Sequence, residues 1–126
     1  MQNISQASAQ DAILLDSEHM AYLKNHLGTH GASDVICKAI DELSLGLARV
    51  QNFGSIADKR AVRQNCKALK IAANLVGLKS LAQVADETFV MIETADDVAL
   101  ASVLERLVRV GQASLSALWE HPDLPF

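Results

Sequence analysis

Apolar residues recur along most of this chain at the three- and four-residue steps of an α-helix. The clearest set begins after Ser33, and its members are Ile36, Ile40, Leu43, Leu47 and Val50. This spacing aligns their side chains in one stripe of a helix that ends near residues 52–55, NFGS. A shorter helix is predicted over residues 16–27, with Asp16 or Ser17 as its cap and Gly28 as its end. The sequence GTHG then predicts a turn between the two helices.

Three further helices follow from the same periodicity. Residues 57–76 carry an apolar stripe that ends before Gly77, and Ser55 with Asp58 resembles a capping pair at its start. The stripes of the three helices consist, in turn, of Val62, Cys66, Leu69, Ala73 and Val76; of Leu78, Leu81, Ala85, Phe89 and Ile92; and of Leu100, Leu104, Leu107, Gly111, Leu115 and Leu118. In the ETADD break before the last helix, 96–120, Thr94 is expected to cap and Asp97 to face the helix N-terminus. The last helix ends at HPDLPF, because proline does not continue a helix.

Helices of this length joined by short connections predict an all-α fold, an antiparallel up-and-down four-helix bundle with an additional N-terminal helix or turn. The 126 residues suit a single domain over 1–126. Residues 1–13 and 122–126 are expected to be loose termini.

Composition narrows the function. The net charge of −4 argues against nucleic-acid binding and against a polybasic membrane-surface role. No secretory signal or membrane span is apparent, so a soluble, cytoplasmic protein is expected. The two cysteines, Cys37 and Cys66, lack metal-type spacing and lie on or beside apolar stripes, which favours reduced, buried thiols.

The outward face of the helix over 57–76 is basic. At about 100 degrees per residue, six side chains fall within about 60 degrees of Lys67. They are Arg60, Arg63, Gln64, Lys70, Ile71 and Asn74. A solvated helix face is one interpretation, since lysine and arginine are common there. Ile71 among cations also marks a possible docking site for an anionic, partly apolar partner.

The stretch KALKIAANLVGLKSLAQVADE, residues 67–87, resembles the histidine-containing phosphotransfer (HPt) domains of bacterial phosphorelays. Their usual pattern is H-x-L-K-G-x-A-x-x-x-G, and Leu69, Lys70, Ala73 and Gly77 match it. The likeness extends over most of residues 14–118 and implies the same helical bundle. Two positions depart from the pattern. Lys67 stands where the phosphorylated histidine belongs, and Ile71 replaces a glycine.

These departures argue against phosphotransfer. A phosphorelay histidine attacks with a neutral imidazole nitrogen, whereas a lysine with an ordinary pKa of about 10.4 has no lone pair at neutral pH. Ile71 adds bulk beside the acceptor position. The other candidate acceptors or metal ligands are the histidines outside the pattern, for which surface or helix-end positions are the better default. They are His19, His26, His30 and His121.

The resemblance therefore implies a pseudo-HPt domain that docks a response-regulator receiver domain, or a histidine kinase, without carrying phosphate. Receivers present carboxylates around their phosphoacceptor aspartate, which complements the cations around Lys67. Ile71 and Leu45 are candidate apolar contacts. Leu45 is either exposed or buried against another helix, and burial is the preferred prediction. No catalytic residue, metal or cofactor is expected.

Such a protein would sequester a receiver, compete for it or scaffold it. Two alternatives stay open. One is a structural or dimerisation bundle with no receiver partner, and the other is an active phosphotransferase with a different acceptor. The chain is expected to be a monomer or a homodimer.

Overall fold

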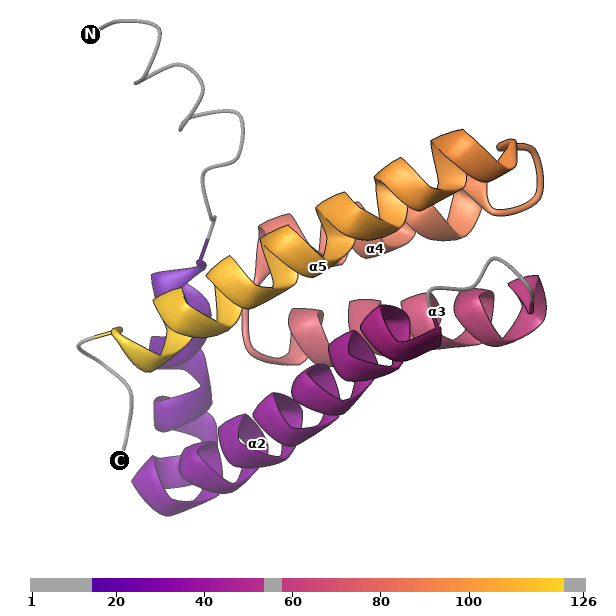
Figure 1. Cartoon of the computed structure of the whole chain (residues 1–126). Coiled ribbons are helices and arrows are strands. Elements are labelled where there is room, and N and C mark those ends of the chain that lie inside the picture. Colours follow the sequence, from indigo (N-terminus) through magenta and orange to yellow (C-terminus); the bar gives the residue numbers. More distant parts are fainter. Residues whose placement is uncertain (1–14, 54–57, 122–126) are drawn as a thin grey trace, which may run out of the picture.

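The computed structural model describes residues 15–53 and 58–121, and these residues form an all-α four-helix bundle (Figure 1). Its helices are α2 (Ser17–Phe53), α3 (Lys59–Leu75), α4 (Lys79–Met91) and α5 (Asp97–Trp119). Each helix packs against the next along the chain, and α5 closes the ring by packing against α2. The bundle fold predicted from the apolar stripes is confirmed. The predicted loose termini, 1–13 and 122–126, lie outside the described residues.

The apolar stripes supply the core, as predicted. All five members of the α2 stripe and all five of the α3 stripe are buried, while Phe89 in α4 and Leu115 in α5 are partly buried against the same cluster. Cys66 is fully buried, but Cys37 is exposed, so the expectation of two buried thiols is wrong for Cys37. Cys37 follows Ile36 by one position, which turns its side chain about 100 degrees away from the stripe.

The helical conformation is interrupted at Gly28 alone, whereas the sequence predicted a turn over the four residues GTHG. Gly28 has φ 73 and ψ 169, a conformation that glycine adopts without the steric cost other residues meet, and the helix resumes at once. α2 is therefore a kinked helix of two limbs, an N-terminal limb (17–27) and a long limb (29–53), rather than two helices separated by a GTHG turn. Figure 1 shows the N-terminal limb turned sharply away from the long limb, at the end of the bundle where α5 finishes.

The N-terminal limb is fastened to the turn between α3 and α4. The Asp16 amide donates to the Gly77 carbonyl oxygen at 2.9 Å, and the Asp16 carboxylate lies 3.6 Å from the Lys79 ammonium. Gly77 has φ 76, and a Cβ there would lie 3.2 Å from atoms of Asp16 and His19. Glycine at this position therefore permits both the end of α3 and the close approach of the limb.

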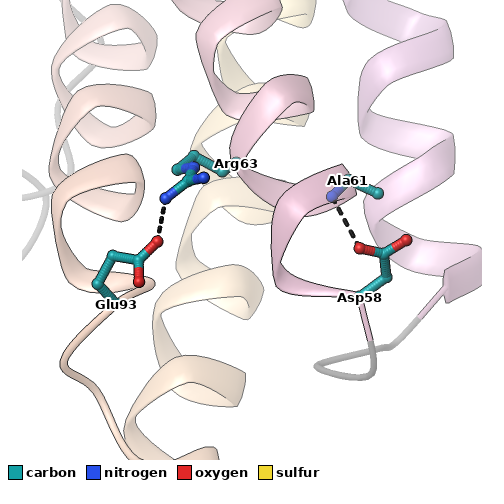
Figure 2. A network of polar contacts seen from close by, with 4 residues as sticks. All are labelled: Asp58, Ala61, Arg63 and Glu93. Carbon is teal, nitrogen blue, oxygen red and sulfur yellow. Dashed lines mark hydrogen bonds and ion pairs between the residues drawn. The ribbon is translucent and has the colours of Figure 1, made fainter.

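Aspartates cap the starts of α3 and α5, whereas α4 begins after Leu78 without a side-chain cap. The Asp58 carboxylate accepts a hydrogen bond from the Ala61 amide at 3.1 Å, as part of the predicted capping pair, whereas Ser55 lies outside the described residues (Figure 2). At the start of α5 the cap is Asp96, which accepts from the Ala99 amide at 2.8 Å. The predicted Thr94 cap is wrong, because the Thr94 amide donates to the Met91 carbonyl oxygen and places Thr94 inside the turn.

None of the helices within the described residues has the length and apolar content that crossing a membrane requires.

Candidate partner-binding site

Lys67 lies near the middle of α3 with its side chain exposed to solvent. The helix presents it outward because Val62 and Leu69, on the opposite side, are fixed in the core. In the part of the chain that the structure describes, no carboxylate pairs with Lys67. Its ammonium is therefore available to a partner.

Two of the other basic residues on this face, Arg63 and Lys70, already have carboxylate partners. On the side toward α4, Lys70 Nζ lies 2.9 Å from an Asp86 carboxylate oxygen, and Arg63 donates to Glu93 (Figure 2). These two cations are neutralised within the bundle. The sequence predicted one basic stripe that included both cations, because the periodicity of α3 does not reveal that Asp86 on α4 and Glu93 in the turn after α4 lie beside them.

Arg60, Gln64 and Asn74 are exposed, as expected for the outward face of α3. Within residues 15–53 and 58–121, the side chains of these three residues form no hydrogen bond or ion pair. Together with Lys67 they form the polar part of the face that remains open to a partner.

Apolar side chains accompany Lys67 on the side toward α2. Ile71 is 56% exposed and Leu75 is 48% exposed, both on α3. Leu45 on α2 is 52% exposed, so the favoured reading of Leu45 as buried is wrong. The reason is its position opposite the α2 core stripe, where no neighbouring helix covers it.

Leu45 lines a shallow groove between α2 and α3, which we call the α2–α3 groove. The groove residues are Glu42, Leu45, Gly46, Arg49, Asn65, Ala68 and Leu69. The helices approach closely here, because a Cβ on Gly46 would lie 2.6 Å from Leu69 Cδ2. The Asn65 side-chain amide donates to the Gly46 carbonyl oxygen at 2.8 Å, which fixes the floor of the groove.

Arg49 is a site residue that sequence reasoning missed. It is exposed, lines the groove, and has no ion-pair partner among residues 15–53 and 58–121. The signal available in the sequence was its spacing of four from Leu45, which places both residues on one face of α2. That signal becomes useful only once Leu45 is known to be exposed.

The four histidines are not gathered into one site. His19 Nε2 donates to the Leu75 carbonyl oxygen at 2.8 Å, and His26 Nδ1 donates to the Tyr22 carbonyl oxygen at 3.0 Å. Both rings stack on Tyr22, with centroid separations of 5.8 and 4.0 Å. Within the described residues, no group of three or more histidine, cysteine or acidic side chains is placed to hold a metal ion.

The remaining two histidines lie elsewhere. His30 is highly exposed and lies 3.9 Å from Asp34 within α2, and His121 Nε2 lies 3.2 Å from the Ser17 hydroxyl. In the described part of the chain, neither histidine interacts with Lys67.

No protein-family model, no curated protein and no solved structure matches this chain. The HPt likeness accordingly rests on the residues themselves.

Proposed function

We propose that this chain is an HPt-like signalling domain that docks a response-regulator receiver domain without carrying phosphate. The observation that carries the proposal is Lys67, an exposed cation at the position where the HPt pattern has its phosphorylated histidine. Around it, three of the four residues that match the pattern have structural roles, since Leu69 and Ala73 are buried and Gly77, with positive φ, follows the end of the helix.

The chemistry of the face supports binding rather than transfer. Phosphotransfer needs a neutral nitrogen lone pair at the acceptor position, and a solvated lysine ammonium has none. A receiver's carboxylate cluster provides a complementary charge for Lys67. Ile71 replaces the small residue of the pattern with an exposed apolar side chain, which contributes contact area.

A phosphotransfer assay separates a docking domain from an active one. The purified protein is incubated with phosphorylated receiver domains, and acid-labile phosphate on the chain is measured. We expect none on the unchanged protein. The double variant Lys67→His with Ile71→Gly restores both departures from the pattern, and we expect it to acquire label. Acid-labile phosphate on the unchanged chain would contradict the proposal and indicate a different acceptor.

A binding titration separates docking from a purely structural bundle. Receiver domains are titrated against the protein and against Lys67→Glu, whose reversed charge repels the receiver carboxylates. Binding that weakens in the variant supports docking. If the chain binds no receiver, the face around Lys67 is an ordinary solvated surface and the structural alternative holds.

A further inference from the structure

The two flanks of α3 differ in what they offer a partner. Toward α4, Arg63 and Lys70 already have carboxylate partners, Glu93 and Asp86. A partner that used either cation would have to break an existing ion pair. Ion pairs at the surface contribute little to stability, but the competing carboxylate stays beside the cation and offsets the gain from a new contact.

Toward α2 the flank is open. Leu45 lies in the wall of the α2–α3 groove with about half of its surface exposed, and Ala68 lines the opposite wall. Ile71 and Lys67 adjoin this wall, because residues three and four apart are neighbours on a helix: Ala68 precedes Ile71 by three, and Lys67 precedes it by four. We call Lys67 and Ile71 the rim of the groove. The groove and this rim therefore form one surface of apolar and cationic groups.

The charge of this surface is positive overall. Arg49 lies in the groove and Lys67 on its rim, and neither has an ion-pair partner in the described parts of the chain. Glu42 is the acidic residue among those that line the groove. Two cations against one carboxylate favour a partner that brings carboxylates of its own over a second copy of this chain, which would add the same excess of positive charge.

We infer that the partner is held by the α2–α3 groove and its Lys67 rim, and not by the basic residues on the α4 flank. The matching partner surface has apolar side chains for Leu45 and Ile71, with carboxylates placed to meet Arg49 and Lys67. This inference rests on the proposed function, because it names the part of the face that a receiver contacts and the chemistry that the receiver must present.

Four single variants test the inference with matched loss of charge. Arg49→Gln and Lys67→Gln each remove one cation from the groove surface, while Arg63→Gln and Lys70→Gln each remove one from the α4 flank. Net charge falls equally in all four, so a difference between the pairs reports position rather than general attraction. A receiver domain that binds the unchanged protein serves as the probe, and thermal unfolding of each variant verifies that it folds.

We expect each groove variant to weaken receiver binding by about 5- to 10-fold, and each flank variant by less than about 2-fold. Leu45→Ala should weaken binding by about 10-fold, since apolar contacts at the centre of an interface carry much of its affinity.

Three results would overturn the inference. If the flank variants lose affinity and the groove variants keep it, receivers dock elsewhere on α3, and the proposed function survives without this inference. If the chain sediments as a dimer that Leu45→Ala dissociates, a second copy occupies the groove. If no receiver binds the unchanged protein, the proposed function fails and this inference fails with it.

Discussion

Lys67 and Lys70 are three residues apart on one helix, yet their surroundings give them different roles. Lys70 reaches the Asp86 carboxylate on α4, whereas Lys67 projects between the flanks with no carboxylate beside it in the described structure. A charge that is already paired adds little to binding, so the two lysines are not interchangeable as contacts. The environment of each residue, rather than its type, decides which one a partner can use.

The two cysteines differ in the same way, and their reactivity tests the burial of the core. Burial raises the pKa of the Cys66 thiol to about 12, so Cys66 stays protonated and covered at pH 8, while Cys37 is exposed. We expect a thiol reagent at pH 8 to label one cysteine rapidly in the native protein and both in denaturant. In the native Cys37→Ser variant, only Cys66 remains, and it should react slowly with the reagent. Rapid labelling of that variant would contradict the buried position of Cys66.

Gly111 allows α5 to approach the Leu47 side chain of α2 closely. A Cβ at this position would lie 2.5 Å from Leu47 Cδ2, and Leu47 is itself buried in the core. We expect Gly111→Ala to lower the free energy of unfolding by about 1–3 kcal/mol, because the packed leucine has to move. Chemical denaturation measures the change, and Ala113→Gly, at an exposed position of the same helix, serves as a reference for backbone effects. An unchanged or raised stability in Gly111→Ala would show that the two helices are not packed this closely.

At the scale of the element, the beginnings of α3 and α5 each depend on a single capping side chain. Asp96 caps α5 through the Ala99 amide, and Asp58 caps α3 through the Ala61 amide. We expect Asp96→Ala to destabilise the protein by about 1 kcal/mol, since one amide at the helix start loses its acceptor. Thr94→Ala is the matched control and should change stability by less than about 0.5 kcal/mol. If both variants lost the same free energy of unfolding, the assignment of Asp96 as the cap would be contradicted.

We expect the attachment of the N-terminal limb to the turn between α3 and α4 to depend on pH through Asp16. The hydrogen bond from the His19 amide lowers the pKa of Asp16 below its ordinary value of 3.8, and the nearby Lys79 ammonium acts in the same direction. The ionised carboxylate is favoured in the folded state, so its contribution to stability is present above pH 3.8 and is lost as pH falls through the lowered pKa. Asp16→Asn should therefore be less stable than the unchanged protein at pH 7, and urea denaturation should show the difference shrinking toward pH 3. A difference that does not change with pH would contradict this origin.

Most of the fold could be predicted from the periodicity of apolar residues, because each stripe had to be buried against another. The stripes do not reveal which outward residues a neighbouring helix will reach. Lys70 pairs with Asp86 on α4 and Arg63 pairs with Glu93 in the turn after α4. Leu45 and Arg49 stay open beside α3, and both outcomes depend on how the helices are placed around the bundle. Gly28 shows a local limit of the same kind, since one residue with positive φ accomplishes what the sequence predicted as a four-residue turn.

At the scale of the whole molecule, the bundle places one open basic and apolar surface beside a flank whose cations are already satisfied. The net charge of the chain is −4, so attraction for an acidic partner has to come from this local surface and not from the protein as a whole. Local attraction of this kind is weakened by salt over a short range, with a Debye length of about 10 Å at 0.1 M.

The most direct test of the account is a titration of receiver domains from the same genome against the unchanged protein and Lys67→Glu, at low and at moderate salt. We predict that at least one receiver binds the unchanged protein, more weakly at the higher salt, and that Lys67→Glu removes this binding while the variant unfolds at the same temperature. Binding that Lys67→Glu leaves intact, or the absence of binding to every receiver, would contradict the claim that the face around Lys67 is a receiver-docking surface.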